Sequence, residues 1–179
     1  MHEQKKEMKL QALLHQIVVD TQKFLAENPA LKFYSVGFDC NAEYAEILLC
    51  FNTEEAFQKT LKHYQSGKYS HLYQTEEQIF DLRFNTGDWD YQGVSAYTAF
   101  SEDELTELYQ EDYEKMRIEM MDFNYQLMQK FCQTACYKSI PKTNNFRPIC
   151  IDHEEDVDYA IKQTEQLIQD EKEYSCFLS

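Results

Sequence analysis

The sequence predicts an α+β fold for a single domain that covers residues 1–179, with four main helices packed on a mixed or antiparallel sheet. Three observations favour this fold class. Long segments carry apolar residues at helical spacing, β-rich runs lie between them, and glycine and proline number only four and three. This scarcity leaves little room for linkers, and 179 residues can bury a core without disulfides or metals.

The first two helices follow from spacing and capping. Residues 3–27 carry apolar side chains at helical spacing. The Asn-Pro pair that follows ends the helix, because the residue before a proline is displaced from helical geometry. Asn52 and Glu55 resemble a capping box and predict a second helix over residues 52–65.

The sheet is expected to contain a hairpin at 32–51 and two further strands. Within the hairpin, KFYSVGFDC and AEILLCF are β-rich runs joined by a turn that Asn41 leads. The run IFDLRF (79–84) fits a strand or the end of a short helix, and we place a strand near it. A last strand is expected at 146–152, after an Asn-Asn turn.

A long third helix is expected from Ser101, which forms a capping box with Glu104. Its apolar stripe continues to Ala135. A straight helix of this length would measure about 45 Å, against a radius of gyration of about 16 Å for the whole globule. The helix therefore spans the molecule or bends, and the expected break is at residues 122–124. A fourth helix is expected over residues 154–169.

Acidity is the strongest property of the whole chain, with a formal net charge of −15. Such a chain repels phosphate, so nucleic acids and anionic membranes are disfavoured as partners, and basic proteins and metal cations are favoured. The alternative is that acidity only keeps the protein soluble. No segment has the ~20 apolar residues of a membrane span. The start of the chain lacks a signal peptide, so we expect a cytoplasmic protein with reduced cysteines.

The most informative segment is 84–114, which contains no Lys or Arg but has nine carboxylates and seven aromatic residues. Negative charge beside large amphipathic rings suits a surface that holds a cationic partner. The competing interpretation is that the rings are core, and Phe100, Tyr109 and Tyr113 are expected inside because they fit the helical stripe. The residues predicted to bind a partner are Asp88, Trp89, Asp90, Tyr91, Glu102, Asp103 and Glu104.

A second candidate site is the acidic segment 152–158, at the junction of the last strand and the last helix. Its carboxylates and its histidine could ligate a divalent cation. The default interpretation is helix capping, with Asp152 as N-cap and Glu155 at the third helical position. No calcium-loop or His-x-x-x-His pattern is present. The candidate metal ligands are Asp152, His153, Glu154 and Glu155.

The sequence lacks the common motifs for catalysis and cofactor binding. It has no G-x-S-x-G, no G-x-G-x-x-G and no Walker-type loop. Cys132 and Cys136 lie one helical turn apart, which favours two cysteines buried side by side over a redox or zinc pair. We therefore expect no cofactor and no catalytic residue, and an enzymatic activity is disfavoured.

Four segments resemble a bacterial family catalogued as domain of unknown function 4303: LRFNTGDWDYQG, FYSVGFD, FNTEEAF and FRPICIDHEEDVD. The resemblance covers nearly the whole chain. The chain departs from the family pattern at Thr86-Gly87, where Ser-Pro is expected, and in the late acidic segment, which keeps a single His. The second departure argues against a metal site. The family is similar in style to small acidic immunity proteins of toxin systems, which implies protein binding.

The resulting hypothesis is a non-enzymatic, cytoplasmic protein-binding module of the immunity or antitoxin type. Its acidic aromatic face would engage a basic protein such as a nuclease toxin. One alternative is a metal-binding protein or enzyme that uses residues 152–158. Another is a housekeeping domain whose acidity has no specific partner. The oligomeric state is left open.

Overall fold

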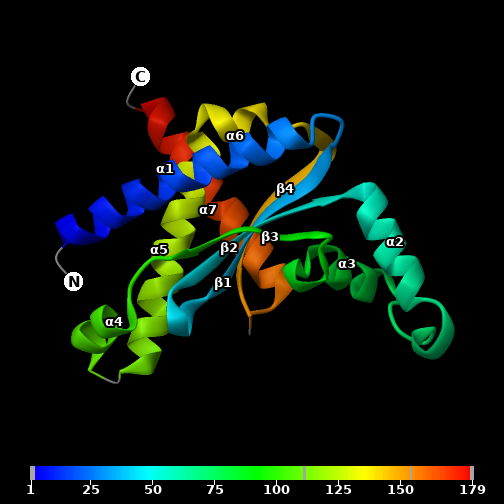
Figure 1. The fold of residues 1–179 in the computed structure, drawn as a ribbon, viewed down its shortest axis with the longest axis horizontal. Coiled ribbons are helices and arrows are strands. Elements are labelled where there is room, and N and C mark those ends of the chain that lie inside the picture. The colour runs from blue at the N-terminus through cyan, green and yellow to red at the C-terminus, as the bar shows by residue number, and fades with distance from the viewer. Residues whose placement is uncertain (1–2, 111, 154, 178–179) are drawn as a thin grey trace.

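The computed structural model describes residues 3–110, 112–153 and 155–177, with residues 170–177 as backbone only. Its fold is α+β, as the sequence predicted, with helices around a four-stranded sheet (Figure 1). The elements in chain order are α1 (Glu3–Glu27), β1 (Phe33–Asn41), η1 (Ala42–Tyr44), β2 (Glu46–Thr53), α2 (Glu54–Tyr64), η2 (Gly67–Tyr69), α3 (Glu76–Phe84), η3 (Thr86–Asp88), β3 (Tyr91–Thr98), α4 (Glu102–Tyr109), α5 (Tyr113–Gln133), α6 (Ala135–Ser139), β4 (Lys142–Asp152) and α7 (Val157–Phe177), where η marks a short 3-10 helix.

The sheet is mixed and has the strand order β3-β2-β1-β4. β2 pairs antiparallel with both β1 and β3, and β4 pairs parallel with β1, so that Phe38 lies opposite Cys150. β1 is thus an inner strand, and it is buried from Phe33 to Cys40. Burial on both faces explains why this strand is rich in apolar residues on both sides rather than alternating with polar ones.

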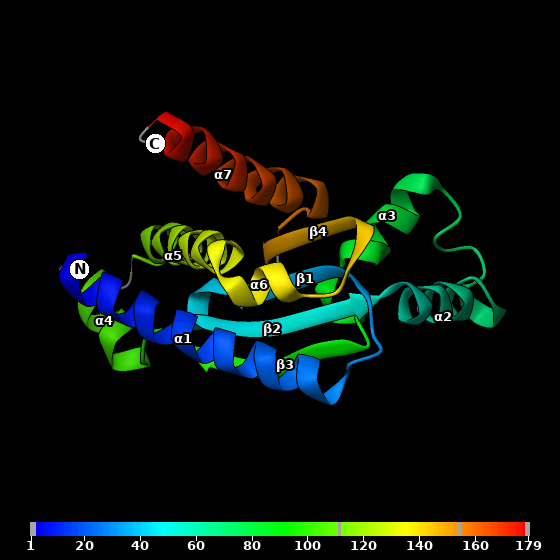
Figure 2. The same cartoon turned by 90° about the horizontal axis from the view of Figure 1, so that it is seen from above.

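Helices cover both faces of the sheet (Figure 2). On one face, Phe33, Phe38 and Phe51 pack with residues of α1 and α5 in the larger part of the core. On the other, Tyr34 and Ile149 pack with residues of α2, α3 and α7 in a smaller part. Figure 2 shows α1 and α7 on opposite sides of the sheet, and we call the two sides the α1 face and the α7 face.

The expected first helix, hairpin and last strand correspond to α1, β1 with β2, and β4. The Asn-Asn turn predicted before the last strand is wrong, because β4 begins at Lys142 and includes both asparagines. The second helix is α2, but its N-cap is Thr53 rather than Asn52. The Thr53 hydroxyl accepts a hydrogen bond from the Ala56 amide at 3.2 Å. Asn52 is buried, and its side chain donates to the Tyr34 hydroxyl at 2.9 Å. This asparagine joins the hairpin to the core instead of capping the helix.

The run at 79–84 belongs to α3, the helical one of its two interpretations, so the strand placed near it lies elsewhere. Thr75 and Gln78 form a capping box that begins the helix, and Leu82 and Phe84 reach the core of the α7 face. The fourth strand is β3. It lies at the edge of the sheet and is mostly exposed or half-buried, so its sequence, YQGVSAYT, lacks a strong apolar pattern.

The long third helix is interrupted earlier than predicted. Gln110 ends α4 with a left-handed backbone, at a φ of 47°, and Asp112 caps α5. Residues 122–124 are helical and Phe123 is fully buried, so the break predicted there is wrong. Tyr113 was also predicted to be inside, but it is 66% exposed because it is the first residue of α5. Phe100 and Tyr109 are buried, as predicted.

Two further expectations concern membranes and cysteines. In the part of the chain that the structure describes, no helix has an apolar stretch long enough to cross a bilayer. Cys132 and Cys136 are both buried, as predicted, but they do not lie one turn apart on one helix, because α5 ends at Gln133 and Cys136 belongs to α6.

Gly37, in the middle of β1, permits a close approach on the α7 face. A Cβ at this position would lie 3.0 Å from Cγ2 of Thr86 and 3.0 Å from Cζ3 of Trp89. The indole has little freedom to move, because its Nε1 donates to the Arg83 carbonyl at 3.0 Å and its ring packs edge-on against Tyr34. The missing side chain therefore lets η3 and the residue after it close onto the sheet.

The Gly37→Ala substitution is expected to lower the free energy of unfolding by about 1–3 kcal/mol, the usual cost of overpacking a core. Alanine also reduces the conformational entropy of the unfolded chain, which stabilises the folded protein by about 0.4–1 kcal/mol. The net effect of the substitution is still expected to be destabilising. Gly87→Ala is the matched control, since its Cβ would meet nothing closer than the Asn85 side-chain oxygen at 3.4 Å. Urea denaturation measures both variants, and equal stability would contradict the contact at Gly37.

Candidate functional site

The first half of the predicted partner-binding set surrounds η3. Trp89 is 4% exposed and belongs to the core of the α7 face. Asp88 accepts hydrogen bonds from the Tyr64 hydroxyl and from Nδ2 of Asn85, both at 2.7 Å. Its hydrogen bond raises the pKa of Tyr64 to about 12, because ionisation of the phenol would place a second negative charge beside the carboxylate. Asp88 and Trp89 thus have structural roles.

Tyr91 and Asp90 complete this half. Tyr91 is half-buried, and its ring meets Phe24 and Phe33 edge-on within the core of the α1 face. Asp90 is exposed, with its carboxylate 3.5 Å from Nζ of Lys59. Of the four residues, Asp90 is therefore the one whose side chain lies mainly at the surface.

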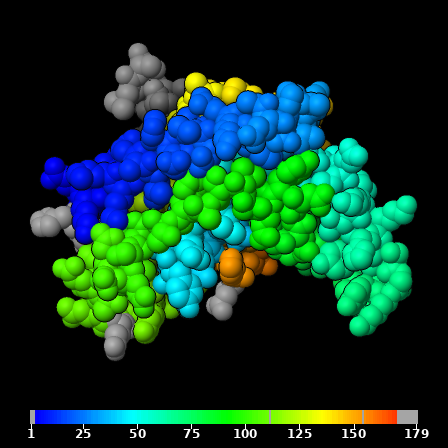
Figure 3. All heavy atoms as spheres, in the orientation of Figure 1, coloured from blue at the N-terminus to red at the C-terminus, as the bar shows by residue number. Residues whose placement is uncertain are grey.

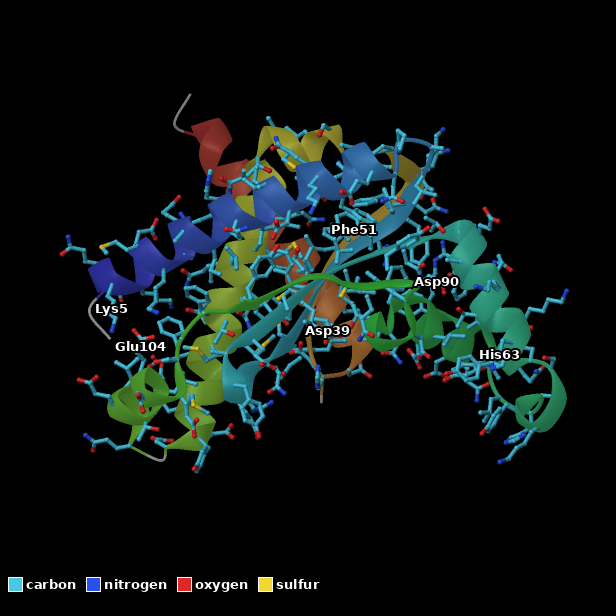
Figure 4. All side chains as sticks on the ribbon, in the orientation of Figure 1. Lys5, Asp39, Phe51, His63, Asp90 and Glu104 are labelled. Carbon is cyan, nitrogen blue, oxygen red and sulfur yellow. The ribbon has the colours of Figure 1, made fainter. Side chains whose placement is uncertain are left out.

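The second half, Glu102 to Glu104, lies in the first turn of α4, at the other end of the molecule. Figure 4 shows Asp90 on the side of α2 and α3 and Glu104 near the start of α1. The chain between them crosses the sheet as β3. The structure therefore does not bring the predicted residues together on one face.

Glu104 ties α4 to α1. Its carboxylate accepts hydrogen bonds from Nζ of Lys9 at 2.8 Å and from the Ser101 amide at 3.0 Å, and it lies 2.9 Å from Nζ of Lys5. The two lysines and the capping contact hold the pKa of Glu104 at about 2. Glu102 and Asp103, two and one residues earlier, are exposed.

A hollow of about 470 Å³ lies beside this turn, and we call it the tyrosine groove. In Figure 3 the turn between β1 and β2 (cyan) lies next to α4 and the start of α5 (green, lower left). Tyr44 and Tyr113 are 62% and 66% exposed. None of the described residues that line the groove is Lys or Arg. The lining comprises the apolar or aromatic Tyr44, Phe100, Leu105, Tyr109, Tyr113 and Met116, the acidic Glu43, Glu46, Glu102 and Asp112, and Thr98 and Thr106.

A second hollow, of about 500 Å³, lies on the α7 face at the carboxyl ends of the parallel strands β1 and β4. We call it the Asp39 cleft. It contains three of the four candidate metal ligands from the acidic segment, and Glu154, the fourth, lies outside the described residues. The lining comprises Asp39, Tyr73, Asp81, Leu82, Asn85, Thr86, Gly87, Gln92, Ile151, Asp152, His153, Glu155 and Val157.

Asp39 is the buried carboxylate of this cleft, with 4% of its surface exposed. One of its oxygens lies 3.1 Å from Nε2 of His153. The other accepts a hydrogen bond from Nε2 of Gln92 at 3.2 Å. These contacts connect the carboxyl ends of β1 and β4 with the start of β3. Each carboxylate oxygen can accept a further hydrogen bond.

Asp152 and Glu155 are held by other parts of the fold. Asp152 accepts a hydrogen bond from the Ala42 amide at 3.2 Å, so it joins the end of β4 to η1. Glu155 accepts a hydrogen bond from the Tyr125 hydroxyl at 3.0 Å, and burial raises the pKa of its carboxyl group. Asp152 is not the N-cap of α7, contrary to prediction. Asp156 has that role, since its carboxylate accepts from the Tyr159 amide at 3.0 Å.

A metal site would need ligands that converge on one point. Within the described ranges, no group of three or more His, Cys, Asp or Glu side chains is placed to hold a metal ion. The carboxylates of the Asp39 cleft are distributed around the hollow instead.

Sequence reasoning missed the cleft residues outside the acidic segment, above all Asp39. One signal could have identified it, because Asp39 is the only charged residue in the run FYSVGFDC, which otherwise consists of apolar, aromatic and small residues. A buried charge is rarely found without partners. Asp81, Asn85 and Gln92 gave no such signal.

A model of the family described as Domain of unknown function (DUF4303) matches residues 13–167. The match covers most of the chain and includes both hollows. Comparison with curated proteins and with solved structures gave no match.

The Trp89→Ala substitution is expected to lower the free energy of unfolding by about 3–5 kcal/mol, because it empties a site in the core. The control is Tyr113→Ala, an exposed aromatic residue whose removal should change stability by less than about 0.5 kcal/mol. Urea denaturation followed by far-UV circular dichroism measures both. A loss below about 1 kcal/mol for Trp89→Ala would contradict a core role.

Glu104→Gln is expected to cost about 1 kcal/mol at neutral pH, because glutamine keeps the capping contact but loses the charge opposite the lysines. The folded-state pKa of about 2 lies below the ordinary value, so the contribution of the charge is fully present above about pH 4.3 and is lost as pH falls toward 2. The difference in unfolding free energy between wild type and variant should shrink between pH 5 and pH 3. Glu102→Gln is the charge-matched control, and the same difference at every pH would refute the assignment.

Proposed function

The chain belongs to the DUF4303 family, and we propose that it is a protein-binding module whose tyrosine groove holds a basic protein partner. One observation carries the proposal. Tyr44 and Tyr113 stand 62% and 66% exposed beside a hollow with an apolar floor and acidic walls. Large exposed aromatic rings at a concave surface are typical of binding sites.

The chemistry of the groove suits a cationic, partly apolar ligand surface. Its four carboxylates, from Glu43, Glu46, Glu102 and Asp112, form acidic walls without a compensating Lys or Arg among the described lining residues. A charge of −15 on the whole chain increases the attraction for a basic protein at long range and raises the rate of encounter. Phe100, Leu105 and Met116 offer apolar surface to the stems of lysine or arginine side chains.

The floor of the groove and the start of α4 are held in place by contacts within the protein. Phe100 packs against Phe123 with ring centroids 5.3 Å apart, and the Tyr109 hydroxyl donates to Glu119 at 2.8 Å. Glu104 anchors the start of α4 to two lysines of α1. A preorganised surface loses less conformational entropy on binding, which favours affinity.

The biological role that we propose is that of an immunity or antitoxin-like protein in the bacterial cytoplasm, with a nuclease toxin as the basic partner. It is supported by the acidic composition and by the likeness to small acidic immunity proteins. Of the residues predicted from sequence, Glu102 lines the groove, and Asp103 lies one residue further along the exposed first turn of α4. Asp88 and Trp89 contribute to the fold rather than to this surface.

The test uses a photo-crosslinking amino acid at position 113 in cells that naturally produce the protein. The crosslinked protein is identified, purified and titrated against the wild-type chain at low and high salt. The proposal expects a basic protein whose affinity falls with salt, and whose affinity falls about 10- to 100-fold in a Tyr44→Ala, Tyr113→Ala double variant.

A matched pair of charge variants, one in the groove and one outside it, tests the role of the acidic walls. Asp90→Asn removes one exposed carboxylate at the far end of the molecule, and Glu102→Gln removes one within the groove. The association rate should fall in the second and stay near the wild-type value in the first. A crosslinked partner that is acidic, or one that binds the double tyrosine variant as well as wild type, would overturn the proposal.

A further inference from the structure

The Asp39 cleft is a separate site, distinct from the tyrosine groove. It lies at the carboxyl ends of two adjacent parallel strands, β1 and β4, and is bordered by α3, η3 and the start of α7. Crevices at this position in sheets with parallel strands are common ligand sites. A volume of about 500 Å³ is in the range of pockets that hold small organic molecules.

The polar groups of the cleft are mainly hydrogen-bond acceptors. Four carboxylates line it, from Asp39, Asp81, Asp152 and Glu155, together with one histidine, and no Lys or Arg occurs among the described lining residues. Burial and the nearby carboxylate of Asp156 raise the pKa of Asp81. Arg117, outside the lining, lies 4.0 Å from the Asp152 carboxylate, and His153 contacts Asp39, so the four carboxylates outnumber the groups that can offset their charge.

Thr86 brings a hydroxyl group to the cleft. Thr86 is 3% exposed and lines the cleft, and no described residue forms a hydrogen bond with its side chain. Its methyl group lies toward Gly37 of the sheet, and the residue also lines the hollow. The hydroxyl oxygen has lone pairs that can accept hydrogen bonds, so it suits a ligand with N–H donors.

The arrangement selects an organic cation over a metal ion. The cleft carboxylates do not form a group of three or more His, Cys, Asp or Glu ligands for a single ion within the described residues. Acceptors spread around a hollow are matched by donors spread along a molecule. Apolar side chains, from Leu82, Ile151 and Val157, would contact its methylene groups.

We propose that the Asp39 cleft binds a small organic cation with two or more amino groups, of the size of a diamine or a linear triamine. One ammonium group would donate to the free acceptor positions of Asp39 and to the Thr86 hydroxyl. The other would lie toward Asp81, at the exposed end of the cleft. This ligand site does not depend on the protein-binding role of the groove.

Trp89 provides a local reporter for the experiment. It is the only tryptophan of the chain, and it packs beside Thr86 against Gly37. The full-length protein is titrated with spermidine at low salt, and both the heat and the tryptophan emission are recorded. The proposal expects saturable binding of one molecule per chain with a matching change in emission.

The variants separate the cleft from general attraction to an acidic protein. Asp81→Asn and Thr86→Val should each weaken spermidine binding about tenfold, because each loses a direct contact with a charged donor. Asp39→Asn should weaken it further, and the exposed Asp81 variant keeps the test decisive if the buried substitution fails to fold. Asp103→Asn and the double tyrosine variant of the groove should bind like wild type.

Two competing ligands complete the design. Mg²⁺ at equal ionic strength should not reproduce the emission change, and 1,8-octanediol, which has no charge, should not bind. The proposal is overturned if spermidine shows no saturable binding, if Mg²⁺ gives the same response, or if the cleft variants bind spermidine as tightly as the Asp103 control.

Discussion

The fold depends on the burial of β1, which is covered on both faces and hydrogen-bonded on both edges. Its aromatic side chains anchor the α1 face, and Gly37 lets η3 and Trp89 close onto the α7 face. The strand is buried from Phe33 to Cys40, and its last residue, Asn41, is half-buried. Asp39 lies near that end and lines the cleft, and η1 follows directly after β1.

Both hollows adjoin this end of β1, on different sides. The Asp39 cleft is lined by Asp39 near the end of β1, and the tyrosine groove is lined by Glu43 and Tyr44 of η1. Asp152 connects the two, because it lines the cleft while its carboxylate accepts from the Ala42 amide of η1. Each hollow therefore combines residues of one acidic segment indicated by the sequence with carboxylates from the β1–β2 hairpin, namely Asp39 in the cleft and Glu43 and Glu46 in the groove.

The sequence predicted elements whose burial follows a regular period and missed those whose burial is irregular. α1, the β1–β2 hairpin and β4 have strong apolar patterns, and their positions agree with the structure. β3 is an edge strand with small and polar residues, so its pairing depends on β2 rather than on its own pattern. Trp89 is buried because Gly37, 52 positions earlier, leaves room for it, and local sequence carries no information about that contact. Tyr113 continues the helical spacing but lies after a left-handed residue, which turns it outward.

The parallel pairing of β1 with β4 also has a consequence for synthesis. Phe38 lies opposite Cys150, so the two strands are more than a hundred residues apart in the chain. Ribosomes add about 5–20 residues per second, and β1 therefore waits roughly 5–20 s for its second neighbour. During that time an apolar strand presents an unpaired edge, which is a template for association with other chains. The most protected strand of the finished molecule is thus the one that nascent chains must shield until translation reaches β4.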